Sequence, residues 1–74
     1  MHKQISGKEC IKILCNKFSF KAVRQKGSHV VLKKEHFNGV VGTVVPLHDT
    51  LKTGTLKSIL ALAKIDEEEF FKYM

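Results

Sequence analysis

The chain has 74 residues, a formal net charge of +6 and 43% hydrophobic residues. This length suits one domain, spanning residues 1–74, with a thin core, so it excludes a large cavity between domains and favours a surface site. No apolar run approaches the ~20 residues that cross a bilayer, and residues 1–4 lack the apolar stretch of a signal peptide, so we expect a cytoplasmic protein without a membrane partner.

The first expected element is a helix that follows Ser6 and runs to about Lys17. Ser6 and Glu9 have the spacing of a capping box, in which each side chain bonds to the other residue's backbone amide. Gly7 lies in the apolar sector, where a missing side chain permits close approach of another backbone segment. The expected buried stripe consists of Ile11, Leu14, Cys15 and Phe18.

Cys10 and Cys15 lie five residues apart on this helix. That spacing turns them about 140° from each other, so they cannot form a disulfide without distortion. They also lack the CxxC spacing of a zinc or redox site. We expect buried structural thiols, with Cys15 in the stripe and Cys10 at its edge.

Three strands are expected next, at residues 20–25, 29–34 and 40–45. Residues 26–28 form the first turn, and Asn38-Gly39 forms the second because both residues tolerate positive φ. Pro46 ends the third strand or confines it to a sheet edge. If Val30 and Leu32 face the helices, alternation along the strand turns His29 away from the core.

A loop at residues 47–52 leads to a helix at 53–63, whose stripe is Leu56, Ile59, Leu60 and Ala63. Asp66 and Glu69 have the spacing of another capping box, with Ile65 stapled onto Phe70, before a short third helix. The resulting order is α-β-β-β-α plus a short C-terminal helix. It predicts a two-layer α+β domain with the element order of double-stranded-RNA-binding domains.

The positive charge is concentrated in the body of the chain. Residues 1–65 contain twelve Lys and Arg and three acids, a net +9, whereas residues 66–74 contain one Lys and four acids, a net −3. A basic body favours a polyanionic partner, because each phosphate contact releases counterions. Nucleic acid is therefore the expected ligand, although many small basic proteins bind nothing specific.

His29 is the candidate catalytic residue. It follows the Gly27-Ser28 turn, and the nearby cations that can hold phosphate are Arg24, Lys26, Lys33 and Lys34. A histidine there can accept the proton of a ribose 2′-OH or donate one to the leaving 5′-oxygen, while the cations stabilise the charged phosphorane. The alternative is an ordinary surface histidine.

A second phosphate site is expected where the 53–63 helix begins. The residues there are Lys52, Thr53, Gly54, Thr55 and Lys57. Free amides and the helix dipole attract anions, although capping by Thr53 or Thr55 would explain the threonines alone. His48 is a possible second proton-transfer group or a loop residue. His2 and His36 have no evident partners, and the histidines lack metal-ligand spacing, so we expect no metal and no cofactor.

Four segments in order resemble the HicA toxin family of toxin–antitoxin systems. They are residues 24–29 (RQKGSH), 43–48 (TVVPLH), 54–60 (GTLKSIL) and 65–70 (IDEEEF). The resemblance implies a double-stranded-RNA-binding-like fold, a type II toxin with ribosome-independent cleavage of mRNA, neutralisation by a HicB-type antitoxin, and catalysis by His29. Many relatives read Thr-Val-Pro where this chain has Thr43-Val44-Val45-Pro46, so the extra valine predicts a one-residue register shift near Pro46.

Two alternatives stay open at this point. The first is a non-catalytic module that binds double-stranded RNA, which needs the same charge and fold but not His29. The second is a protein-binding domain, in which Val31 on the outer sheet face belongs to an interface.

Overall fold

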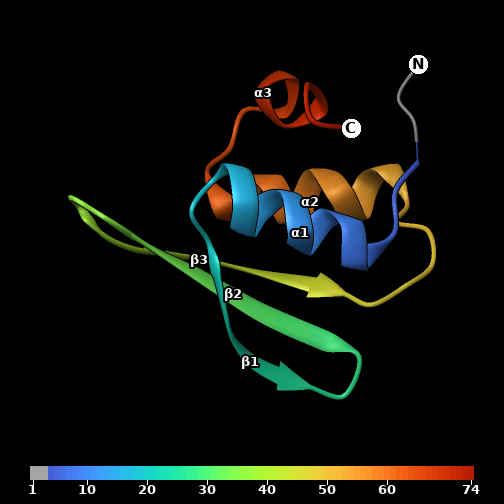
Figure 1. Ribbon diagram of the computed structural model, residues 1–74, viewed down its shortest axis with the longest axis horizontal. Helices are drawn as coiled ribbons and strands as arrows, with labels where there is room; N and C mark the ends of the chain where they lie inside the picture. Colours follow the sequence, from blue (N-terminus) through green and yellow to red (C-terminus); the bar gives the residue numbers. More distant parts are fainter. Residues whose placement is uncertain (1–3) are drawn as a thin grey trace.

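The computed structural model describes residues 4–74, which form three helices and three strands (Figure 1). The elements are α1 (Gly7–Lys17), β1 (Lys21–Lys26), β2 (His29–His36), β3 (Gly39–Pro46), α2 (Thr53–Ala63) and α3 (Glu67–Phe71). The expected α+β class and element order are confirmed, and each strand matches its expected range to within two residues. No helix in residues 4–74 is long and apolar enough to span a bilayer. Most of the segment considered for a signal peptide, residues 1–3, lies outside this range.

The strands form one antiparallel sheet in the order β1-β2-β3, and α1 and α2 lie on one face of it (Figure 1). Val30 and Leu32 are buried beneath the helices, as expected, and they are paired with Val45 and Thr43 of β3. The buried Thr43 hydroxyl donates a 2.8 Å hydrogen bond to the carbonyl oxygen of Ile59. This bond fixes α2 along β3 and satisfies a polar group that would be costly to bury alone.

The two long helices differ in how well their buried faces were predicted. All four expected stripe residues of α2 are buried. In α1 the buried line is instead Gly7, Cys10 and Leu14, whereas the expected Ile11, Cys15 and Phe18 are only half-buried. The face is rotated because α1 meets the sheet through Gly7, while Phe18 turns towards α3 and stacks on Phe70 with 6.1 Å between ring centroids.

The helix caps also divide into one confirmed and one wrong prediction. Ser6 and Glu9 form the expected capping box, with two 3.1 Å hydrogen bonds between side chain and backbone. Asp66 is the N-cap of α3, but no side-chain cap is present in this part of the described chain. Glu69 instead forms a 3.1 Å ion pair with Lys72, which draws its carboxylate away from the start of the helix.

Register irregularities do not lie where the sequence suggested. Across the described strands β2 and β3 the pairing is continuous from His36–Gly39 to His29–Pro46, so the extra valine is accommodated without a bulge. The shift lies between β1 and β2, in the bulge around Val23. The second turn also differs, because its positive φ is at Gly39 alone (129°) and Asn38 keeps a negative φ.

Candidate active site

His29 is the first residue of β2 and is exposed on the face of the sheet opposite the helices. Gly27 has a φ of 59°, which a residue without a Cβ adopts at little cost, and this allows the two-residue turn before His29. The Ser28 carbonyl accepts a 2.7 Å hydrogen bond from the Leu47 amide, and the Gln25 side chain donates to the Gly27 carbonyl at 3.1 Å. The backbone before His29 is therefore held on both sides.

The imidazole itself has no partner within the described chain: no residue of 4–74 forms a hydrogen bond or ion pair with it. A histidine fixed by structural bonds would have at least one ring nitrogen committed to a neighbour. Here both nitrogens are free to meet a substrate. The strand thus presents an exposed imidazole from a fixed backbone, an arrangement that general acid or base chemistry can use.

The cations near His29 divide between the two faces of the sheet. Lys26 is directly paired with His29, and Arg24 is paired with Val31, so both share the outer face with His29. Lys33 is also on that face but lies four residues, or about 13 Å, along the strand. Lys34 is on the opposite face, with its Nζ 5.7 Å from the Phe20 ring centroid. Lys26 and Arg24 are therefore the cations best placed to act with His29.

The start of α2 is open. Its N-cap is Lys52, and no side chain within the described residues forms a capping hydrogen bond there. Neither Thr53 nor Thr55 therefore caps the helix. Thr53 and Gly54 are exposed and Thr55 is half-buried. The first amides of the helix therefore remain available to an anion, and the exposed Lys57 follows one turn later.

Both halves of the expected site lie at one end of the molecule. The start of α2, the start of α1, the β1–β2 turn and the end of β3 gather at the right of Figure 1. Backbone hydrogen bonds connect the start of α1 to the loop between β3 and α2. The Gly7 amide donates to the His48 carbonyl at 2.9 Å, and the Leu51 amide donates to the Ile5 carbonyl at 2.8 Å. The sheet separates the two halves, however, since His29 is on its outer face and α2 is on its inner face.

His48 lies apart from His29. Its ring is exposed and borders a shallow groove of about 280 Å³ beside the start of α1, together with Ser6, Lys8, Leu47 and Asp49. His29 does not line this groove, and the two rings make no contact within the described structure. The carbonyl of His48 holds the Gly7 amide, so the loop role of this residue is visible in its backbone.

The other candidate chemical groups are the two cysteines and the remaining histidines. Within residues 4–74, no group of three or more His, Cys, Asp and Glu side chains could hold a metal ion. Cys10 is fully buried and Cys15 is half-buried, and both are free thiols. The order of their burial is the reverse of the one expected, because α1 is rotated. His2 lies outside the described residues, and His36 does have partners, Phe37 and Asn38.

Sequence reasoning missed one positioning contact at this end of the molecule. Gly7 packs so closely against the Pro46 carbonyl that a Cβ would overlap it, and Pro46 is paired with His29. The sequence predicts close approach at this glycine, but its partner, Pro46, follows only from the three-dimensional structure.

The family model described as the HicA toxin of bacterial toxin–antitoxin systems matches residues 7–65 of the 74-residue chain. No curated protein matches the chain. The matched segment contains the β1–β2 turn, the whole of the sheet and α2.

Proposed function

Because this chain belongs to the HicA toxin family of bacterial toxin–antitoxin systems, we propose that it is a metal-independent endoribonuclease that cuts mRNA without the ribosome. As a type II toxin it would be neutralised by a HicB-type antitoxin protein, and it would act in the cytoplasm, where mRNA is translated. The observation that carries the proposal is the exposed ring of His29, which forms no hydrogen bond or ion pair within residues 4–74 and lies opposite Lys26 across a two-residue turn.

The proposed reaction uses the RNA's own ribose. The 2′-oxygen attacks the adjacent phosphorus and the bond from phosphorus to the 5′-oxygen breaks, which leaves a 2′,3′-cyclic phosphate and a 5′-hydroxyl. One proton leaves the 2′-hydroxyl and one is delivered to the 5′-oxygen, and His29 performs one of these transfers. Lys26 and Arg24, on the same face, stabilise the charge that develops on the phosphoryl oxygens. DNA lacks the 2′-hydroxyl and should survive.

RNA phosphates outside the scissile group would lie on the outer cations and on the open start of α2. The helix amides at Thr53 to Thr55 and the flanking Lys52 and Lys57 supply that second anchor. Since the anchor is on the inner side of the sheet, the RNA would wrap around the sheet end rather than lie flat on one face.

The decisive experiment is RNA cleavage in the presence of a chelator, with wild type, His29→Ala and His48→Ala compared side by side. Circular dichroism first shows that all three are folded. We expect cleavage by wild type and none by His29→Ala, and a partial loss in His48→Ala would identify the second proton-transfer group. Equal cleavage by wild type and His29→Ala, or comparable cleavage of DNA, would contradict the mechanism.

The second candidate function is a module that binds structured RNA without cutting it. The cationic face and the open helix start favour RNA binding whether or not His29 is chemically active. Salt-dependent binding by pure wild type without cleavage would support this function. A protein-binding domain alone would show no salt-dependent RNA binding.

The antitoxin must block the site that we propose. An acidic protein surface would complement the basic body and cover His29 and the lysines at the start of α2. Titrating the toxin with its antitoxin should abolish cleavage at saturation. Cleavage that continues in the saturated complex would show that the antitoxin does not mask the site directly.

A further inference from the structure

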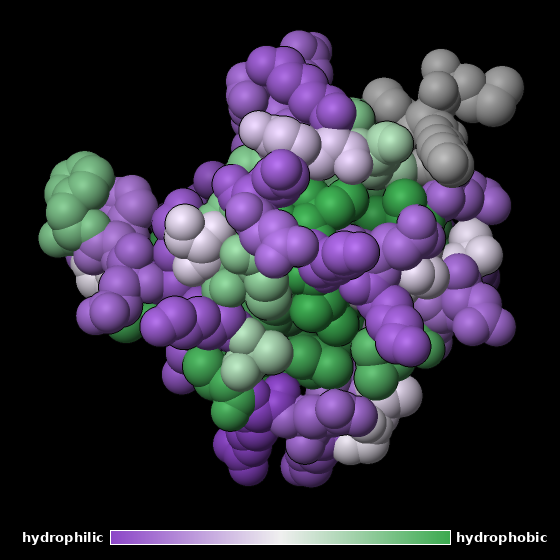
Figure 2. All heavy atoms as spheres, in the orientation of Figure 1, coloured by the Kyte–Doolittle hydropathy of each residue, from purple (hydrophilic) through white to green (hydrophobic). Residues whose placement is uncertain are grey.

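The β2–β3 hairpin projects from the body of the molecule and ends in an exposed aromatic ring. The turn residues Phe37 and Asn38 lie between the paired residues His36 and Gly39. Phe37 is 90% exposed, more than Val40 at 65%, the next most exposed of the large hydrophobic residues in the described chain. Figure 2 shows this as hydrophobic surface at the hairpin tip, on the left, away from the rest of the apolar surface.

The Phe37 ring has one aromatic neighbour, the ring of His36. The His36 ring stacks on Phe37 with 4.4 Å between centroids and 29° between planes. The Asn38 amide donates to His36 Nδ1 at 3.4 Å, which restrains the imidazole. The His36 ring thus lies against one side of Phe37, and the 90% exposure of Phe37 leaves most of its ring open as an apolar platform.

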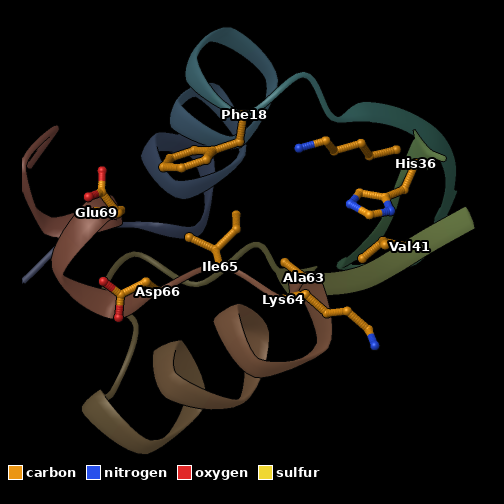
Figure 3. Close-up of a pocket in the computed structure, with 9 residues that line it drawn as sticks. Phe18, His36, Val41, Ala63, Lys64, Ile65, Asp66 and Glu69 are labelled. Carbon is orange, nitrogen blue, oxygen red and sulfur yellow. The ribbon is translucent and has the colours of Figure 1, made fainter. Parts of the chain in front are cut away.

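One lysine, Lys64, lies near the base of the hairpin tip. His36 and Lys64 both border a groove of about 160 Å³ at the base of the tip. A neighbouring groove of about 230 Å³ is shown in Figure 3, where His36 and Lys64 lie at the hairpin end and Asp66 and Glu69 lie towards α3. Asp66 and Glu69 are thus at the far end of this groove, and Lys64 is the charged residue at its hairpin end. The acid nearest the tip is Glu35, which is paired with Val40.

We propose that the hairpin tip binds an unpaired base of the RNA, which stacks on the open face of Phe37 while a flanking phosphate contacts Lys64. An aromatic platform next to a cation is the usual combination for single-stranded nucleic acid, because every base has a π-face. His36, the last residue of β2 before the tip, is seven residues or about 23 Å along the strand from His29, so the tip takes a nucleotide other than the scissile one. This inference rests on the proposed function and names single-stranded RNA as its substrate.

The test measures binding of a fluorescent 2′-O-methyl RNA oligonucleotide, which cannot be cleaved, by fluorescence anisotropy. Phe37→Ala and Phe37→Leu should bind about 5- to 150-fold more weakly than wild type, because both lack a π-face, and Phe37→Tyr should bind like wild type. Leu62→Ala removes another exposed apolar side chain, on α2, and should leave binding unchanged. Since the Phe37 side chain is almost fully exposed, thermal melting should be nearly the same for all the Phe37 variants.

Each other outcome overturns the stacking site. Equal binding by Phe37→Ala and wild type would refute it, and so would full binding by Phe37→Leu, which would indicate a general apolar contact. Loss of antitoxin binding with RNA binding intact would assign the tip to the protein partner instead. If wild type cleaves RNA while Phe37→Ala binds normally, only this inference fails, whereas a wild type that neither binds nor cleaves RNA would refute the proposed function as well.

Discussion

Gly7, the first residue of α1, packs directly on the backbone carbonyl of Pro46. Pro46 is in turn paired with His29 across the sheet. The contact is backed by a 2.9 Å hydrogen bond from the Gly7 amide to the His48 carbonyl. Because both sides of the contact are backbone, neither can move aside as a flexible side chain would. The start of α1 therefore sets the position of the strand end beside His29.

Gly7→Ala should lower the free energy of unfolding by about 1–3 kcal/mol, because the added methyl group overlaps the Pro46 carbonyl. The overlap should therefore outweigh the ~1 kcal/mol by which alanine stabilises a helix relative to glycine. Urea denaturation measures the change. Gly54→Ala is the matched control, since no described atom lies within 4 Å of its added Cβ, and it should be neutral or stabilising by about 0.4–1 kcal/mol. Equal effects at the two positions would show that the Pro46 contact does not restrict the helix.

Lys26→Gln should weaken RNA binding and reduce cleavage, because it removes the cation paired with His29. If Lys26 contacts one phosphate, the slope of log affinity against log salt should become shallower by about 0.7–0.9. Anisotropy titrations at several salt concentrations measure this slope. Lys72→Gln removes the same charge from a lysine that is paired with Glu69, and it should leave the slope unchanged. A slope that responds equally to both would indicate only a general effect of net charge.

Thr53→Asp should change stability and RNA binding in opposite directions. Thr53 is the first residue of α2, so a carboxylate there interacts favourably with the helix dipole and should stabilise the folded state by about 0.3–1 kcal/mol. The same charge repels a phosphate from the open amides, so affinity for RNA should fall. Ser58→Asp, exposed in the middle of α2, is the control for adding a charge. Unchanged RNA affinity in Thr53→Asp would remove the start of α2 from the RNA site.

The face of β2 that carries His29 was predictable because alternation along a strand depends only on local geometry. Burial of Val30 and Leu32 determines that His29 points outward, and the structure confirms it. The extent of the cationic site was less predictable. Lys33 and Lys34 are adjacent in sequence to the proposed site, yet one is about 13 Å along the strand and the other is on the opposite face.

The rotation of α1 and the hairpin tip could not be derived from local patterns. The buried face of α1 is decided by the contact between Gly7 and Pro46, which are 39 positions apart. At the second turn, the Asn38-Gly39 pair correctly predicted a hairpin, but the turn residues are Phe37 and Asn38. Because the turn lies one residue earlier than the sequence predicts, the Phe37 ring is at the tip. This position follows only from the pairing of His36 with Gly39.

Cys10 gives a prediction about pH and chemical reactivity. Burial raises the pKa of its thiol from the usual 9.0 to about 12. At pH 8, iodoacetamide should therefore modify only the half-buried Cys15 in the folded protein and both thiols in urea, as counted by mass spectrometry. Rapid modification of Cys10 without denaturant would contradict the packing of α1.

The same pKa shift predicts that the folded state loses stability in alkali. Above about pH 9 the unfolded thiol ionises while the folded thiol keeps its proton, so the unfolded state binds fewer protons. The stability associated with the protonated thiol is therefore complete below pH 9 and is lost as the pH rises towards 12, by up to about 1.4 kcal/mol per pH unit. Other groups also titrate in this range, so the measurement is the difference in slope between wild type and Cys10→Ala in urea denaturation at pH 8 to 10.5. Parallel slopes would show that Cys10 ionises as readily in the folded chain as in the unfolded one.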